Sequence, residues 1–301
     1  MKVQLQKETD KKTNHTVDFK ASLWYDVWKR LKKNRLAVIG MINVIILSMV
    51  AIFAPYLAPY NPYEGDLKHD YLKPPSREHP FGTDLVARDV LSRVIYGTRI
   101  SLMVGILARS VSLLIGITLG AIAGYYGGII DNIIMRLADV MFAFPSLLLA
   151  IAISVAMGEP NLYTTFLALG IVGWAGMARL VRGQVLSIRE HEYIQAARAL
   201  GVPDFRIIFR HILPNTLAPI IVSATIGIAG AIMGEATLSF LGLGIQPPNP
   251  SWGSMMSIGR DYLRSAPWLT IYPGIAIAIT VFSFNLLGDG LRDALDPRLK
   301  D

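Results

Sequence analysis

Six long stretches without a charged residue constrain what this chain can fold into. Each comes close to the roughly 20 residues that an α-helix needs to cross a bilayer. Because backbone polar groups in hydrocarbon must form their hydrogen bonds within the chain, we expect every stretch to be helical, with Pro145, Pro214 and Pro273 marking kinks or helix ends. The stretches cover residues 36–57, 110–128, 140–158, 161–178, 212–234 and 265–288. The sequence therefore predicts an all-α membrane protein with six transmembrane helices.

Composition and charge exclude several other classes of protein. Hydrophobic residues make up 52% of the 301 residues and charged residues only 17%, which is too apolar for an ordinary soluble domain. The formal net charge of +7 comes from basic residues gathered in loops and in the N-terminal segment, so it indicates membrane orientation rather than nucleic-acid binding. The chain has no cysteine, which excludes disulfides and cysteine-based metal sites.

The distribution of lysine and arginine predicts which segments face the cytoplasm. Twenty of the 29 lie in alternate connections: 10 before the first span, one in residues 125–138, six in residues 179–211 and three after the last span. The opposite connections carry eight. By the positive-inside rule, both termini and the central charged loop are cytoplasmic, whereas residues 59–99 and 244–264 are extracytoplasmic.

These assignments divide the chain into consecutive segments. Leu23, Val27 and Leu31 recur at four-residue spacing, which is typical of an amphipathic helix that lies at the membrane surface and orients the first span. The predicted segments are a flexible cytoplasmic tail (1–21), this interfacial helix (22–35), the first transmembrane helix (36–58), an extracytoplasmic loop (59–99), the remaining transmembrane domain (100–290) with a cytoplasmic loop (186–215), and a cytoplasmic C-terminus (291–301).

The central charged loop has the pattern of two short helices joined by a sharp turn. Residues 190–200 are rich in helix formers, and Gly201 then breaks the helix. Asp204 is a candidate N-cap for a second helix that ends before Pro214. The apolar stripe of that helix is predicted to comprise Phe205, Ile208, Phe209 and Ile212. Such an elbow transmits a displacement better than a flexible loop does, but the same pattern fits an interfacial hairpin that only joins two spans.

This loop resembles the Glu-Ala-Ala loop of permease subunits in binding-protein-dependent ABC importers. The matching residues are Ala196, Ala197, Gly201, Leu213 and Pro214, whereas Gln195 and His211 replace the family's glutamate and isoleucine. The resemblance implies that the loop sits in a cleft of a cytoplasmic ATPase subunit. The residues that it assigns to this coupling role are Glu192, Tyr193, Gln195, Ala196, Ala197, Leu200, Gly201, Asp204, His211, Leu213 and Pro214.

Three further blocks resemble the C-type permease subunit of oligopeptide, dipeptide and nickel importers. They are the segment at 79–102, the run SFLGLGIQPPNPSWGSM at 239–255 and the ending GDGLRDALDPR at 288–298. The resemblance implies a type I ABC importer permease fold, alternating access and peptide cargo, with nickel or a metal chelate as the alternative. It also implies a B-type permease partner, two cytoplasmic ATPase subunits that bind ATP and Mg, and an extracytoplasmic peptide-binding protein.

The segment at 79–102 is a candidate platform for that binding protein. Thr83 or Asp84 is predicted to cap a helix that follows the turn. Asp84 and Arg88 have the spacing to pair on the surface of this helix, and Ala87, where the family has glycine, is expected to favour it. The candidate platform residues are Gly82, Thr83, Asp84, Arg88 and Asp89. An interfacial lead-in to the second span is the alternative interpretation.

Polar residues within the apolar spans are candidates for the transport pathway or for contacts between helices. Glu235, near the outer end of the fifth span, either lines the route or hydrogen-bonds to a neighbouring helix. Arg109 and Asp139 lie in adjacent spans and are a candidate pair, and Asn43 and Asn285 are candidate bridges between helices. Close helix packing is predicted along one face of the second span by a four-residue glycine repeat at Gly116, Gly120 and Gly124.

The sequence contains no motif for nucleotide or metal binding. No GxxxxGK[ST] phosphate loop appears, and the five histidines lack the spacing of metal ligands. We therefore expect a transport subunit without catalytic, cofactor or metal sites, whose ATP is hydrolysed on partner subunits. An ion-coupled secondary transporter and a membrane scaffold without transport are the alternatives from other classes, and neither needs an ATPase-docking loop.

Overall fold

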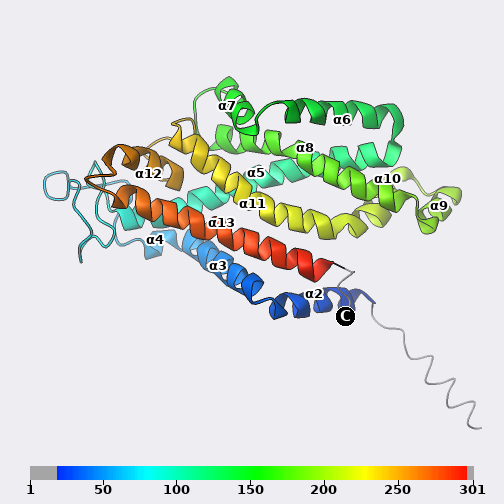
Figure 1. The fold of residues 1–301 in the computed structure, drawn as a ribbon, viewed down its shortest axis with the longest axis horizontal. Coiled ribbons are helices and arrows are strands. Elements are labelled where there is room, and N and C mark those ends of the chain that lie inside the picture. Colours follow the sequence, from blue (N-terminus) through cyan, green and yellow to red (C-terminus); the bar gives the residue numbers. More distant parts are fainter. Residues whose placement is uncertain (1–18, 297–301) are drawn as a thin grey trace, which may run out of the picture.

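The computed structural model describes residues 19–296, with side chains from Tyr25 onward. These residues form a bundle of long α-helices, with α9 and α10 at one end and α12 and the loop that follows α4 at the other (Figure 1). All but the last three residues of the predicted tail lie outside the described residues, as do the Leu23 side chain and residues 297–301.

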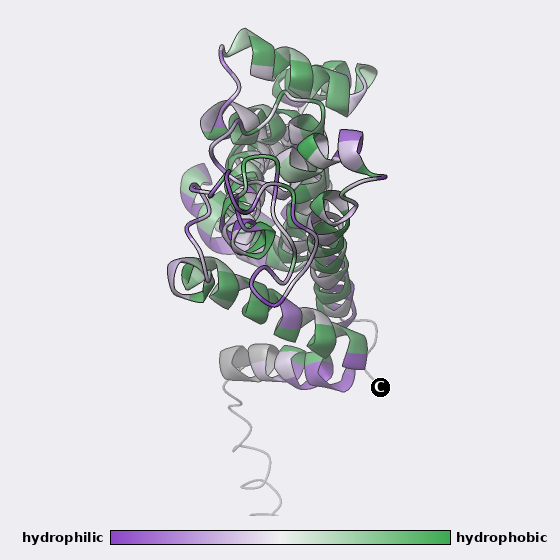
Figure 2. Ribbon diagram, turned by 90° about the vertical axis from the view of Figure 1, so that its left-hand side faces the viewer, coloured by the Kyte–Doolittle hydropathy of each residue, from purple (hydrophilic) through white to green (hydrophobic). Residues whose placement is uncertain are grey.

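Helices account for most of the described chain. They are α2 (Phe19–Lys33), α3 (Arg35–Ile52), α4 (Ala54–Leu57), α5 (Val90–Tyr126), α6 (Gly128–Ala143), α7 (Ser146–Ala156), α8 (Leu162–Arg189), α9 (Glu192–Ala199), α10 (Asp204–Arg206), α11 (Leu217–Phe240), α12 (Trp252–Gly259) and α13 (Trp268–Leu295). The helices that span 35–52, 90–126, 162–189, 204–240 and 268–295 are long and apolar enough to cross a membrane. Hydrophilic residues gather in the loops at the end of the bundle that faces the viewer in Figure 2 and along α2.

The predicted third span is a broken pair of helices rather than a single helix. The axes of α6 and α7 are bent by 98° where the two helices meet. Pro145 lacks a backbone N–H and favours an extended conformation at the preceding residue, and Phe144 accordingly has φ −99° and ψ 141°. Counting this pair as one span gives the predicted total of six.

The other two prolines do not end their helices. From Asp204 to Phe240 the chain stays helical, passing through a π-helix at Ile207–Ile212 and a 3₁₀-helix at Leu213–Thr216 before α11. The prediction that the short second helix ends before Pro214 is therefore wrong, because Pro214 lies in the first turn of the 3₁₀-helix, where its missing N–H removes little. Pro273 likewise lies inside α13.

Helix α5 begins before the uncharged stretch of the second span, at 110–128, but after the predicted cap at Thr83 or Asp84. It starts at Val90 and its N-cap is Asp89, whose side chain accepts a hydrogen bond from the backbone N–H three residues later, so the prediction of a cap at Thr83 or Asp84 is wrong. Ala87 precedes this helix with a φ of +60°. The expectation that Ala87 favours helix is also wrong, because it occupies the left-handed region that suits glycine.

The glycine repeat of α5 packs against α8, which confirms the prediction of close helix approach. Gly116, Gly120 and Gly124 are all buried against that helix. A Cβ at Gly120 would overlap the carbonyl oxygen of Ala178. Because these three glycines have no side chain, they allow α5 and α8 to approach each other closely.

Helix α2 packs against the end of α13. Leu31 is 4% exposed and lies in a small apolar cluster with Ala37 and Ala294. Arg30 Nη1 donates a hydrogen bond of 3.3 Å to the backbone oxygen of Asp296. Part of the apolar side of this helix is therefore covered by protein, and its role in orienting the first span stays a prediction.

Candidate functional site

The central charged loop folds as a sharp elbow, which we define as residues 193–211. Its first arm belongs to α9 and its second arm comprises α10 and the π-helix. Gly201 lies between them with a φ of +74°, a conformation that residues with a Cβ rarely adopt. The Gly201 N–H donates to the carbonyl oxygen of Arg198 at 2.9 Å, and the Val202 N–H donates to that of Ala197 at 3.1 Å. The turn therefore has a defined geometry.

An apolar anchor fixes the first arm to the helix bundle. Ile194 is fully buried, although the residues around it in α9 are largely exposed. It belongs to a core cluster that includes Val185 and Ile188 of α8 and Ile207 and Ile212 of the π-helix. A displacement of α9 therefore acts directly on both α8 and the start of the fifth span.

Tyr125, at the end of α5, connects both arms of the elbow. Its hydroxyl donates a hydrogen bond of 2.6 Å to Asp204 Oδ1 and accepts one of 3.3 Å from Arg198 Nε. The Arg198 guanidinium also lies 4.6 Å from the centre of the Tyr125 ring. Asp204 is thus held by a side chain from α5, and the prediction that it caps the second helix is wrong because Pro203 occupies that position.

The outer surface of the elbow carries exposed apolar side chains. Leu200 is 84% exposed and Phe205 is 71% exposed, and the rings of Phe205 and Phe209 lie 4.4 Å apart. The predicted apolar stripe is therefore partly wrong: Ile208 and Ile212 are buried as members of one apolar face, but Ile207 is buried with them, whereas Phe205 and Phe209 are exposed. Exposed apolar groups of this size at the end of a helical bundle mark a surface suited to protein contact.

The remaining predicted coupling residues lie around this surface. Glu192, Tyr193, Gln195, Ala196 and Pro214 are exposed, whereas Ala197, His211 and Leu213 are half-buried. The Gln195 Nε2 atom donates a hydrogen bond of 3.2 Å to the backbone oxygen of Glu190. The amide at position 195 therefore stabilises the start of the elbow and makes no ion pair.

The candidate platform residues form an internal framework beneath the outer loop. Gly82, Thr83, Asp84 and Asp89 are buried, and Arg88 is half-buried. Arg88 Nε lies 2.8 Å from Asp84 Oδ2, so the predicted pair forms, but it does so in a turn and not on the surface of a helix. These side chains lie beneath the outer loop, so the candidate platform is largely covered by other residues of the chain.

Hydrogen bonds hold this framework to the bundle. The Thr83 carbonyl oxygen accepts a hydrogen bond of 3.1 Å from Trp268 Nε1, at the start of α13. Asp89 Oδ1 lies 2.9 Å from His79 Nδ1. Nearer the solvent, Lys73 Nζ donates to Asp70 Oδ1 at 2.8 Å, and this hydrogen bond lowers the pKa of the Asp70 carboxyl.

Glu235 is fully buried and hydrogen-bonded within the protein. Its Oε1 accepts a hydrogen bond of 2.8 Å from Ser239 Oγ, and its Oε2 accepts one of 3.2 Å from Ser101 Oγ. Ser101 belongs to α5, so this carboxyl group joins two helices, as one of the two sequence-based hypotheses for Glu235 states. Glu235 is also absent from the lining of the two cavities described below.

The predicted pair between Arg109 and Asp139 does not form. Asp139 Oδ1 lies 2.7 Å from Arg179 Nη2, so α6 is joined to α8 instead of to α5. Arg109 Nη2 donates hydrogen bonds of 2.8 Å and 2.9 Å to the carbonyl oxygen and Oγ of Ser223. Asn285 makes no hydrogen bond within residues 19–296, so the bridge predicted from it is not seen there.

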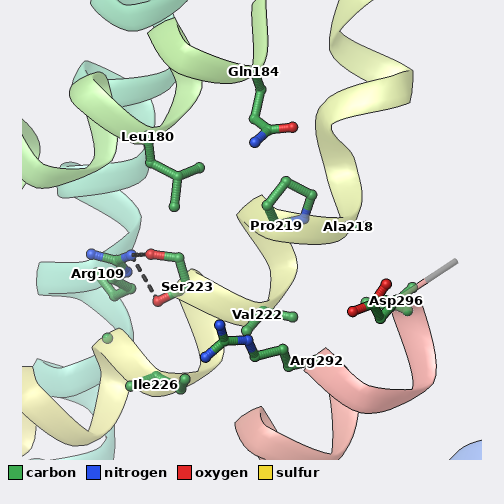
Figure 3. Close-up of a pocket in the computed structure, with 12 residues that line it drawn as sticks. Arg109, Leu180, Gln184, Ala218, Pro219, Val222, Ser223, Ile226, Arg292 and Asp296 are labelled. Carbon is green, nitrogen blue, oxygen red and sulfur yellow. Dashed lines mark hydrogen bonds between the residues drawn. The ribbon is translucent and has the colours of Figure 1, made fainter. Parts of the chain in front are cut away.

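Two cavities lie along α11, and Arg109 and Gly227 line both of them. The larger, of about 710 Å³, extends from Gly227 toward the start of α11, where Gln184 and Arg292 project into it (Figure 3). The smaller, of about 350 Å³, extends from Gly227 toward Thr237. Sequence reasoning identified Arg109 but not these cavities, because the wall of each cavity is assembled from four helices that are far apart in the sequence.

Comparisons with known proteins cover nearly the whole chain. The family described as the binding-protein-dependent transport system inner membrane component matches residues 116–301, and the N-terminal TM domain of oligopeptide transport permease C matches residues 22–75. The dipeptide transport system permease protein DppC of Alkalihalophilus pseudofirmus is 50% identical over 93% of this chain and 91% of its own length. The oligopeptide transport system permease protein OppC of Bacillus subtilis is 44% identical over the same shares of the two chains.

A solved structure shows the same fold. The MetNI methionine ABC transporter in an inward-facing conformation contains a chain that aligns with a TM-score of 0.56 at 18% identity. The alignment covers 68% of this chain and 96% of that chain. The helical architecture is therefore that of type I ABC importer permeases.

Proposed function

Because this chain belongs to the family of inner membrane components of binding-protein-dependent transport systems, we propose that it is the permease subunit of an ATP-driven importer that carries oligopeptides or dipeptides into the cell by alternating access. The chain is a multi-pass membrane subunit of a transport system. The observation that carries the proposal is the elbow, which presents apolar side chains to a partner while it is anchored to three long helices.

The elbow receives the movement that drives transport. Two cytoplasmic ATPase subunits bind ATP and Mg and grip the exposed surface around Leu200 and Phe205. When they close on nucleotide, the elbow moves as a unit, because Ile194 and Tyr125 fix both of its arms. The second arm continues without a break into α11, which lines both cavities, so this helix carries the displacement to the pathway.

The remaining proposed partners contact other faces of the molecule. A B-type permease completes the pathway, since this chain supplies one side of it. An extracytoplasmic peptide-binding protein delivers cargo to the loops that cover the Thr83 framework. The excess of lysine and arginine on the side of the elbow supports a cytoplasmic position for the elbow and both termini.

Crosslinking tests the coupling role directly. The chain has no cysteine, so a Leu200→Cys variant carries one thiol on the exposed elbow. We expect it to crosslink to the ATPase subunits in membranes that contain the whole transporter. Tyr163→Cys is the control, since Tyr163 is also a large exposed residue but lies at the start of α8, at the end of that helix remote from the elbow. Equal capture of the ATPases by both variants, or by neither, would contradict the proposal.

Uptake by proteoliposomes tests which substrate is transported. The complex is reconstituted with its binding protein, and uptake of labelled di- to pentapeptides is compared with uptake of nickel in the presence and absence of ATP. We expect ATP-dependent accumulation of peptides. Accumulation of nickel alone would replace the peptide assignment with the metal alternative, and uptake that persists without ATP in an energised membrane would indicate a secondary transporter.

A further inference from the structure

Arg109 is a positively charged residue at the centre of the bundle. It lies near the middle of α5 and crosses α11 at Gly227, which is near the middle of that helix. A Cβ at Gly227 would overlap the Arg109 guanidinium, so the glycine is what allows this crossing. Both helices therefore place the guanidinium at a similar depth, roughly midway between the two ends of the transmembrane region.

The guanidinium has unused hydrogen-bonding capacity. Its Nη2 bonds only to Ser223, and its Nε is buried without a hydrogen-bond partner. No carboxylate pairs with it among residues 19–296, although Arg179 and Arg182 of α8 pair with Asp139 and Asp131. An arginine without a counter-charge is costly at this depth, so its unpaired state points to an anionic ligand that is not always present.

The position of Arg109 relative to the two cavities indicates where such a ligand binds. The larger cavity lies on one side of Gly227 along α11 and the smaller lies on the other side, and Arg109 lines both. Arg292 adds a second cation to the larger cavity and Gln184 adds an amide, while Asp296 lines its far end, away from Arg109 (Figure 3). A ligand that moves from one cavity to the other therefore passes the guanidinium.

We propose that Arg109 binds a carboxylate group of the cargo at the midpoint of the transport pathway. This inference rests on the proposed function as a peptide permease. Each unmodified peptide ends in a carboxylate, which must lose water as it passes through the bundle. The Arg109 Nη1 atom, which makes no hydrogen bond within the described residues, can donate a charge-assisted hydrogen bond to a carboxylate. It thereby replaces part of that hydration and recognises a feature that peptides of every sequence share.

Paired substrates test the proposal. Uptake of a labelled tripeptide and of its C-terminal amide is measured for the reconstituted wild-type, Arg109→Gln and Arg109→Lys complexes, and the affinity of the binding protein for each peptide is measured separately. We expect Arg109→Gln to lower uptake of the free acid by roughly tenfold to a hundredfold, the range for a lost charge-assisted contact, and to lower uptake of the amide by much less. Arg109→Lys should retain part of the preference for the acid. Arg179→Gln, which removes an arginine paired at the surface, should leave the preference unchanged.

The outcomes separate this inference from the proposed function. If the wild-type complex accumulates no peptide, the proposed function fails. If it accumulates peptide and Arg109→Gln lowers uptake of acid and amide equally, the inference is overturned, and a carboxylate of the partner permease becomes the counter-charge.

A cysteine variant keeps the test decisive if Arg109→Gln fails to assemble. An Arg109→Cys chain is combined with cysteine-free partners and treated with methanethiosulfonate reagents that attach either an ethylammonium or a neutral group. We expect the cationic group to restore the preference for the free acid, and the peptide acid to slow the modification. Equal effects of the two reagents, with no protection by the acid, would overturn the inference.

Discussion

Tyr125 Oη lies 2.6 Å from Asp204 Oδ1 and thereby joins the end of α5 to the second arm of the elbow, 79 residues further along the chain. The same hydroxyl accepts a hydrogen bond from Arg198 of the first arm. One phenol therefore joins both arms of the elbow to the bundle, as the proposed coupling role requires.

Replacing Tyr125 with phenylalanine should weaken coupling without preventing assembly. Loss of a hydrogen bond to the exposed Asp204 costs about 1 kcal/mol, or roughly fivefold in the population of the fixed elbow. We expect fewer peptides transported per ATP hydrolysed, measured in proteoliposomes. Tyr126→Phe is the control, because the Tyr126 hydroxyl makes no hydrogen bond within the described part of the chain. An identical ratio in both variants would show that Tyr125 has no part in coupling.

Replacing Gly201 with alanine should loosen the elbow. The Cβ itself meets no atom within 4 Å, so the cost comes from the φ of +74° and is about 1 to 2 kcal/mol. We expect amide hydrogen exchange within residues 193–211 to accelerate by roughly fivefold to thirtyfold. Gly183→Ala, inside α8 and with equal free space, should leave exchange in the elbow unchanged. Unchanged exchange in the Gly201 variant would mean that the turn tolerates a Cβ.

Replacing Gly120 with alanine should separate α5 from α8. The added methyl group would overlap the backbone oxygen of Ala178, which cannot rotate away as a side chain can. We expect a loss of about 1 to 3 kcal/mol in stability, measured by thermal unfolding of the purified complex. Gly176→Ala, where the Cβ has no neighbour within 4 Å, is the control. Equal unfolding temperatures for both variants would argue against close packing at Gly120.

Replacing Glu235 with glutamine should preserve transport. The amide oxygen still accepts the hydrogen bond from Ser239, and its NH₂ group donates to Ser101, so both buried hydroxyls keep a partner. We expect peptide uptake within about twofold of wild type. Glu235→Leu should instead lower the yield of assembled complex, because it removes the link between α5 and α11. A large loss of uptake by a fully assembled glutamine variant would return Glu235 to the pathway.

The sequence predicts the membrane class, the number of spans and the helix-turn-helix elbow, because each depends on local properties of the chain. An uncharged stretch of about 20 residues must be helical in hydrocarbon, and Gly201 supplies the one conformation that a sharp turn needs. The close packing at the glycine repeat of α5 could likewise be predicted, since residues spaced by four share one face of a helix.

The errors arise where a partner distant in the chain decides the outcome. Asp204 has the residue type of an N-cap, but Tyr125 binds its carboxylate. Arg109 and Asp139 have opposite charges in successive spans, yet the register of α6 against α8 places Arg179 next to Asp139. Helix propensities and the spacing of residues along the chain do not show how one helix is aligned against another.

The order of apolar and charged segments by itself determined that this chain is a helical membrane protein with an elbow between its fourth and fifth spans. Only the tertiary structure decided which side of each helix faces its neighbours. It buried the candidate platform, left Leu200 exposed and placed Arg109 between two cavities. The physical reason is that hydrophobicity drives a helix into the bilayer at any rotation, whereas its rotation and depth are set by close packing and hydrogen bonds with the other helices.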